Sequence, residues 1–322
     1  MTPPPAAAHP IRVGVSSCLL GEAVRYDGGH KRDRFLTDLL GRYVEWVPVC
    51  PELESGLGVP RPAMRLEREG RAVRLREIGS GRDHTARMQR FAARRLRALR
   101  PLELCGYVLK KGSPSCGVAR VKVHRSNGTA AANGRGLFAE VLMEAFPLLP
   151  VEEEGRLNDP QLRENFIERV FAYHRLRSLF AERWTLAALV AFHTAHKLQL
   201  MAHSPAGYRE LGRLVATAGQ VARAQLRDRY ASEFMTALAC LATRRRHVNV
   251  LHHILGYLRP HLDADSRREL LALIDDYGAE LVPLVVPLTL IRHHVRRLTI
   301  PYLQGQLYLE PHPKELMLRN HV

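Results

Sequence analysis

The sequence has few cysteines and no long hydrophobic run. Five cysteines among 322 residues are too few and too scattered for the disulfide framework of a secreted domain. The longest apolar run, residues 281–291, contains Pro283 and Pro287 and is shorter than the roughly 20 residues that span a bilayer. Residues 1–10 lack the pattern of a signal peptide, and their prolines favour a disordered tail. We therefore expect a cytoplasmic protein without a membrane-spanning helix.

Acidic residues are also scarce relative to basic ones. The chain has 48 Lys and Arg against 32 Asp and Glu, a formal charge of +16. Residues 1–150 hold 25 basic and 14 acidic residues, so most of the excess lies in the first half. A high-GC genome would explain why arginine outnumbers lysine, but it would not explain the net charge. The charge favours a polyanionic partner, most readily a nucleic acid.

Residues 11–150 alternate between apolar strand-like runs and helical runs. We expect strands at 11–18, 44–50, 73–78 and 102–109, helices at 33–42, 84–100 and 136–145, and a loop over 122–136. In the helix at 84–100, Met88, Phe91, Ala92, Leu96 and Leu99 fall on one stripe. Strands that alternate with helices predict an α/β domain with a Rossmann-like parallel sheet.

The remainder of the chain has helical periodicity almost throughout. We expect helices at 160–181, 186–203, 205–218, 222–255, 264–277 and 286–297, which form a separate all-α domain over residues 155–322. His193 with His196, and His252 with His253, have spacings found at metal sites. No carboxylate falls in a matching pattern, so we expect most histidines to lie at the surface or between the domains.

Three cysteines share one local setting. Cys18 and Cys50 end apolar runs, and Cys116 follows another through a tight turn at residues 110–116. The carboxyl ends of parallel strands lie at one edge of a sheet, so the three thiols could converge there. Three thiolates suit an iron–sulfur cluster with one free iron, or a zinc with an open position. Cys105 begins its strand and is expected to be structural, and Cys240 is expected in a helical core. Any one of Cys18, Cys50 and Cys116 could instead be a small buried apolar residue without a ligand.

Four segments around these cysteines resemble the TudS-type thiouracil desulfidase family. They are SCLLG at 17–21, RYDG at 25–28, PVCPE at 48–52 and KGSPSCG at 111–117. The resemblance implies a 4Fe–4S cluster held by Cys18, Cys50 and Cys116, with one iron free for the sulfur of a thiocarbonyl. It also implies that Glu52 and Ser113 transfer protons. The same motifs suggest further contacts with substrate, from Ser17, Tyr26, Asp27 and Ser115.

The second half resembles the YbgA-type helical domain. The segments that carry this resemblance lie at 196–203, 208–212, 249–257 and 283–290, and they include no catalytic motif. The fused arrangement is similar to the RudS-type proteins, which remove sulfur from 4-thiouridine in tRNA. A basic protein with an added domain fits a tRNA substrate better than a free thiobase. Backbone phosphates would then meet a set of basic residues, namely Lys110, Lys111, Arg244, Arg245 and Arg246.

Two other functions are compatible with the sequence. The protein could desulfurise small thiolated pyrimidines only, with the helical domain serving oligomerisation. It could instead be a nucleic-acid-binding module whose cysteines hold a structural or sensory metal without turnover. The run at 244–246 could also be a solvated helix end. The sequence leaves the oligomeric state open.

Overall fold

The computed structural model describes residues 10–125, 128–181 and 183–322, so most of the expected tail at 1–10 lies outside the described residues. The chain divides between Asn158 and Asp159 into an α/β unit and a helical unit. Strand β8 (Val151–Glu153) belongs to the first unit, which therefore continues past Pro150. Within the described residues, no helix combines the length and the apolar character needed to cross a membrane.

The main sheet of the α/β unit is parallel, as predicted. It contains β1 (Arg12–Ser16), β2 (Glu45–Val49), β5 (Gly106–Leu109) and β8, in the order β2-β1-β5-β8. The central strand β1 buries Val13 and Val15 completely. Between them, a Cβ on Gly14 would stand 2.2 Å from the ring of Tyr107. A side chain at position 14 would clash with the Tyr107 ring, so glycine is needed there.

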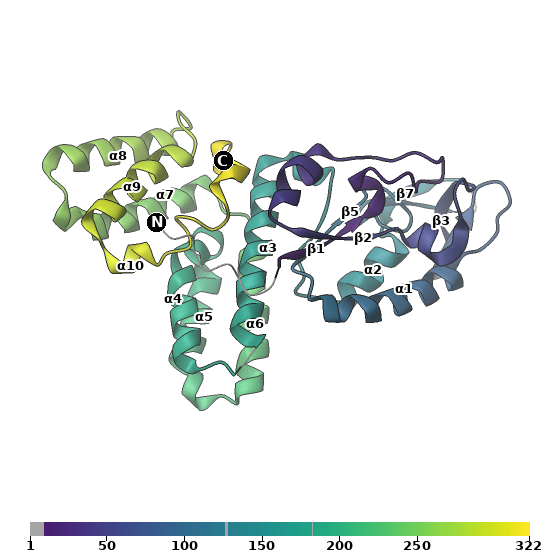
Figure 1. Cartoon of the computed structure of the whole chain (residues 1–322), viewed down its shortest axis with the longest axis horizontal. Helices are drawn as coiled ribbons and strands as arrows, with labels where there is room; N and C mark the ends of the chain where they lie inside the picture. The colour runs from purple at the N-terminus through teal and green to yellow at the C-terminus, as the bar shows by residue number, and fades with distance from the viewer. Residues whose placement is uncertain (1–9, 126–127, 182) are drawn as a thin grey trace. The chain divides into compact units, whose positions relative to one another are not determined.

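Two amphipathic helices cover one face of the main sheet (Figure 1). They are α1 (Thr85–Leu99) and α2 (Leu137–Ala145). All five members of the predicted α1 stripe are buried, which confirms that stripe as a core face. The ring of Phe91 lies 6.1 Å from that of Phe138 on α2, and Phe138 in turn contacts Tyr107 of β5.

A second sheet contradicts the loop expected at 122–136. It contains β3 (Met64–Glu69), β4 (Ala72–Glu77), β6 (Val121–His124) and β7 (Ala130–Gly134), in the order β4-β3-β6-β7. Strand β6 buries Val121 and Val123 and pairs in parallel with β3, a strand some 55 positions earlier. Such short strands depend on a distant partner, which a local pattern does not reveal. Likewise, the helix expected at 33–42 is a π turn (Phe35–Leu39) followed by a 3₁₀ turn (Leu40–Arg42).

The second unit is helical, as predicted. Its helices are α3 (Pro160–Ala181), α4 (Leu186–His203), α5 (Pro205–Ala216), α6 (Arg223–Ala239), α7 (Arg244–Leu258), α8 (Ala264–Gly278), α9 (Val285–Leu298) and α10 (Pro301–Gln304). Several of these helices begin after a residue whose side chain accepts a backbone N–H of the first turn. These capping residues are Thr185, Ser204, Thr243 and Asp263.

The helix predicted over 222–255 is wrong in its length, because two helices occupy this segment. Helix α6 ends at Ala239 and α7 begins at Arg244. Thr243 accepts the backbone N–H of Arg246 and so starts a new helix within an apparently continuous pattern. Cys240 caps the end of α6 and is exposed, which corrects its expected place in a helical core.

Candidate active site

Three cysteines meet at one cavity at the carboxyl edge of the main sheet. Cys18 follows β1, Cys50 follows β2 directly, and Cys116 follows β5 after a six-residue segment. All three line a cavity of about 410 Å³, a volume typical of small-molecule sites. Because β2 and β5 flank β1 on either side, the parallel sheet brings these distant residues together. Cys105 lies at the opposite end of β5 and does not line the cavity.

Burial makes the three thiols hard to ionise without a nearby cation. It raises the pKa of Cys18 to about 11, with a further contribution from the neighbouring Cys50. Burial also raises the pKa of Cys50 and, most strongly, that of Cys116. Metal ligation requires thiolates, so a metal bound here would displace the thiol protons. Three thiols on one cavity, those of the buried Cys18 and Cys116 and the partly buried Cys50, are a donor set of the kind that iron–sulfur clusters use.

Backbone hydrogen bonds fix two of the cysteines. The carboxylate of Glu54 accepts the Cys50 N–H at 2.8 Å. The hydroxyl of Ser113 accepts the N–H groups of Ser115 and Cys116 at 3.2 and 3.1 Å. Since both of these bonds use the oxygen of Ser113 as an acceptor, its O–H remains available to the cavity that it lines. Glu54 was not predicted as a site residue, because a glutamate in a loop is too common to be distinctive.

Glu52 lines the cavity and is held by two side chains. Arg61 donates to its Oε2 from Nε at 3.0 Å and from Nη2 at 2.6 Å. Ser115 donates to its Oε1 at 3.0 Å. Ser115 is fully buried and is not among the residues that line the cavity, so the geometry gives it a supporting role instead of the expected substrate contact. Arg61 was not predicted; an arginine between Pro60 and Pro62 is a weak signal.

The other motif residues take different positions. Ser17 and Tyr26 line the cavity, and Tyr26 is 42% exposed, so its ring is available to a ligand. The guanidinium of Arg25 lies 5.4 Å from that ring. Asp27 does not line the cavity. Its carboxylate accepts from the Gly29 N–H and from Arg25, which lowers the pKa of Asp27, so it shapes the turn that presents Tyr26.

The five basic residues proposed for RNA contact differ in their engagement. Lys110 and Lys111 line the cavity, and Lys110 pairs with Glu154 at 2.5 Å. In the helical unit, Arg244 donates to the Tyr277 carbonyl and Arg246 to the His203 carbonyl. Arg245 is exposed. Two of the three arginines in this run thus brace the start of α7, while RNA contact by the set remains a prediction.

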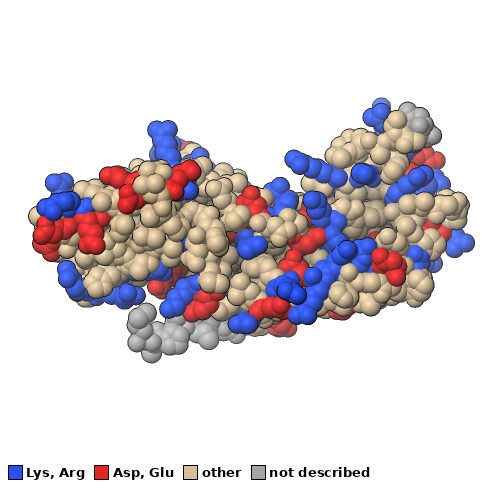
Figure 2. All heavy atoms as spheres, turned by 90° about the horizontal axis from the view of Figure 1, so that it is seen from above, with Lys and Arg blue, Asp and Glu red and all other residues tan. Residues whose placement is uncertain are grey.

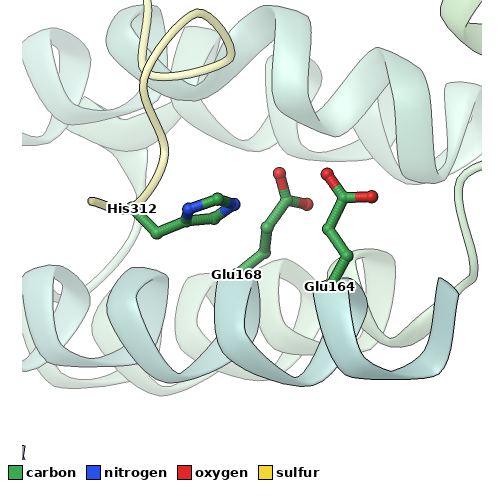
Figure 3. Close-up of side chains that lie close together, drawn as sticks. All are labelled: Glu164, Glu168 and His312. Carbon is green, nitrogen blue, oxygen red and sulfur yellow. The ribbon is translucent and has the colours of Figure 1, made fainter. Parts of the chain in front are cut away.

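The helical unit contains one group of side chains with metal-ligand chemistry among its described residues. Oxygens of Glu164 and Glu168 on α3 and a ring nitrogen of His312 lie within 4.8 Å of one another (Figure 3). Both carboxylates already have cationic partners. Arg319 donates to Glu164 at 2.9 Å and to Glu168 at 2.8 Å, and His203 bonds to Glu168 at 2.6 Å. The group is therefore a buried ion-pair network.

The space beside this network is too small for a substrate. An adjoining cavity lined by Glu164, Glu168 and His203 has a volume of about 20 Å³, which holds roughly one water molecule.

The histidines of the predicted pair at 193 and 196 are buried, contrary to the expected surface position. His193 bonds to the Tyr230 hydroxyl and His196 to the Phe192 carbonyl.

Electrostatics within the network shift three pKa values. Burial and the neighbouring Glu168 raise the pKa of Glu164 to about 7. Burial alone would raise the pKa of Glu168, but the bond to His203 and the charges of His203 and Arg319 lower it. Burial alone would lower the pKa of His203, but its bond to Glu168 outweighs burial and raises it. Glu168 thus carries the negative charge of the pair.

Raising the pH from about 5 to 8 is expected to weaken this network. Glu164 keeps its proton up to about pH 7 in the folded protein, whereas an unfolded glutamate loses it near about pH 4.3, so stability falls as pH rises between these values. His203 acts in the same direction above about pH 6.5, and Glu168 acts only below about pH 4.3. Relative to Glu164→Gln, the unfolding free energy of the wild-type protein should fall by up to about 1.4 kcal/mol per pH unit. Denaturant titrations of both proteins across this pH range would measure the unfolding free energy. Equal slopes of that free energy against pH in the two proteins would contradict a raised pKa for Glu164.

Two family models match this chain, one in each of its two units. The family model for 2-thiouracil desulfurase matches residues 13–154, which lie within the α/β unit, and this unit belongs to that family. A second model, a protein of unknown function named DUF1722, matches residues 197–313 of the helical unit. The protein is therefore a desulfidase-family domain fused to a DUF1722 domain, which confirms the predicted architecture.

Three similar proteins represent these two parts. YbgA of Escherichia coli (strain K12) is 36% identical over 168 residues, which cover 51% of this chain and 98% of YbgA. YbbK of Bacillus subtilis (strain 168) is 33% identical over 153 residues, 45% of this chain and 97% of YbbK. Among solved structures, the [4Fe-4S]-dependent thiouracil desulfidase TudS is 34% identical, with a TM-score of 0.38, over 46% of this chain and 93% of TudS.

Proposed function

We propose that this protein is a 4Fe–4S-dependent desulfidase that converts 4-thiouridine to uridine in tRNA. The observation that carries the proposal is the composition of one cavity. Its lining combines three cysteines with Glu52, Ser113 and a strong excess of basic side chains. The family supports removal of sulfur, and the solved relative TudS is described as [4Fe-4S]-dependent.

Cys18, Cys50 and Cys116 would hold the cluster. With three protein ligands for four irons, such a cluster supplies one iron as a Lewis acid for a soft thiocarbonyl sulfur. The donor set and its burial fit this group. Lys110 and Arg25 favour the thiolate form of Cys18 by their positive charge.

The acid–base residues of the chain complete the reaction. Glu52 accepts a proton from water as the water oxygen adds to the carbon of the thiocarbonyl. The added hydroxyl then gives up its remaining proton as the carbon–sulfur bond breaks, so that a C=O group replaces C=S and sulfur leaves as hydrosulfide without net redox change. Ser113, whose O–H is available to the cavity, relays a proton toward the departing sulfur.

The charge of the cavity favours a phosphate-bearing substrate over a free base. Five basic residues line it, against Glu52 as the one acidic residue: Arg25, Lys31, Arg61, Lys110 and Lys111. Lys31 and Lys111 are exposed, and their ammonium groups form no ion pair with a carboxylate among the described residues. Figure 2 shows Lys and Arg side chains over the surface as well. A base on an RNA chain would bring phosphates to these ammonium groups, while its ring could stack on Tyr26.

Incubation of the protein with thiolated tRNA should convert 4-thiouridine to uridine. The cavity provides the desulfidase residues, and the exposed Lys31 and Lys111 form a basic rim for phosphates. The purified protein, prepared anaerobically, would be mixed in parallel with thiolated tRNA, 4-thiouridine and 4-thiouracil. Mass spectrometry would then measure thiolated and unthiolated products. Turnover of only the small molecules would favour a desulfidase of free thiobases. Intact metal without any turnover would favour a non-catalytic nucleic-acid-binding protein.

The basic rim can be tested within the same experiment. Lys111→Gln should weaken tRNA binding and lower the slope of log affinity against log salt by about one. Lys122→Gln is a matched control, since Lys122 is exposed on β6 and does not line the cavity. Equal effects of the two substitutions would contradict phosphate contact at the cavity.

A further inference from the structure

Every N–H of the Arg61 guanidinium group forms a hydrogen bond within the wall of the active-site cavity. Its side chain is 5% exposed. Nε and Nη2 donate to Glu52 Oε2, Nη1 and Nη2 each donate to the Val24 carbonyl at 3.1 Å, and Nη1 donates to the Gly58 carbonyl at 2.8 Å. These five bonds match the five N–H donors of a guanidinium. Arg61 is therefore held rigidly and has one carboxylate partner, Glu52.

This arrangement leaves one acceptor position on Glu52. A carboxylate has about four lone-pair positions. The two bonds from Arg61 fill both positions on Oε2, and Ser115 fills one on Oε1. Within the described residues, the second lone pair of Oε1 has no protein donor. It is the position from which Glu52 can accept a proton in the cavity that it lines.

Arg61 also joins the segments that surround this carboxylate. Its backbone N–H donates to the Tyr26 carbonyl at 2.9 Å, and its side chain holds the Val24 carbonyl. The Cys50 thiol lies 3.8 Å from the same Val24 oxygen. The residue thereby connects the turn after β1, which carries Tyr26, to the segment after β2, which carries Cys50 and Glu52.

We propose that Arg61 is the positioning residue for Glu52, fixing the carboxylate so that the free lone pair of Oε1 is the one that takes the proton from water. The inference rests on the proposed function, in which Glu52 transfers that proton. Catalytic groups must be held to within a fraction of an ångström, and a misplacement of about 1 Å costs on the order of 100-fold in rate. A lysine keeps the charge but cannot reproduce the planar set of bonds.

Arg61→Lys should lower kcat by roughly 10- to 100-fold while KM changes less than about threefold. Iron and sulfide content and the affinity for thiolated tRNA should match the wild-type protein, because the cysteines and the exposed Lys31 and Lys111 are unchanged and a lysine at position 61 keeps the positive charge. In Arg61→Gly, added guanidinium ion should restore part of kcat, whereas sodium chloride at equal ionic strength should not. Arg65→Lys is the matched control, since Arg65 also donates from Nε and Nη2 to one carboxylate oxygen, that of Glu67, but does not line the cavity.

Two outcomes would overturn the inference. The first is wild-type kcat in Arg61→Lys, and the second is a loss of iron or tRNA affinity that accounts for the whole drop in turnover. Glu52→Gln separates this failure from that of the proposed function. An active Glu52→Gln protein would remove proton transfer by Glu52 itself, whereas an inactive one beside a fully active Arg61→Lys would remove only the positioning role.

Discussion

Replacing Cys116 by alanine is expected to lower turnover of thiolated substrate by more than about 100-fold and to remove most of the bound iron. Loss of a residue that merely supports a metal ligand costs about 10- to 100-fold, so loss of the ligand should cost more. Cys116 is buried at the end of the segment that follows β5, and it lines one cavity together with Cys18 and Cys50. Two remaining thiols would not hold a cluster of four irons.

Cys240→Ala is the control for this experiment. Cys240 is exposed at the end of α6, in the helical unit, so the substitution changes the thiol count without touching the cavity. Iron and acid-labile sulfide analysis, the visible absorbance spectrum and turnover would be measured on both proteins after anaerobic purification. Unchanged iron content and turnover in Cys116→Ala would contradict a cluster at this cavity.

Replacing Arg319 by methionine is expected to destabilise the helical unit by about 3–5 kcal/mol. Removal of one member of a buried ion-pair network leaves charge without compensation, and this range is typical of that loss. Arg319 is buried and contacts both Glu164 and Glu168, so its removal leaves two carboxylates with His203 as the remaining bonded partner among the described residues. Denaturant or thermal unfolding of the full chain, followed by circular dichroism, would measure the change.

Arg268→Met provides the comparison. Arg268 pairs with Asp265 on α8, and both side chains are largely exposed, so this pair should contribute about 0–1 kcal/mol. Adding Glu168→Gln to Arg319→Met should recover part of the lost stability at neutral pH, because Glu168 carries the negative charge of the pair whereas Glu164 keeps its proton below about pH 7. Equal destabilisation by Arg319→Met and Arg268→Met would show that burial does not govern the strength of the network.

The sequence determined the architecture because its signals are local. Apolar runs of strand length before Cys18 and Cys50, and the buried stripe of α1, depend on residues close in the chain. The helical caps at Thr185 and Asp263 are local as well, since each contacts an N–H three residues later. Strand β6 escaped prediction because it pairs with β3, more than 50 residues away.

The residues around Glu52 could not be predicted in the same way. Arg61 and Ser115 lie 9 and 63 positions from it, and no spacing rule relates them. Their contacts arise because adjacent parallel strands deliver three separate segments to one edge of the sheet. The sequence by itself thus singled out three thiols and one carboxylate that the fold brings to one cavity. The tertiary structure decided which oxygen of that carboxylate remains free, because hydrogen bonds from distant segments depend on their final positions in space.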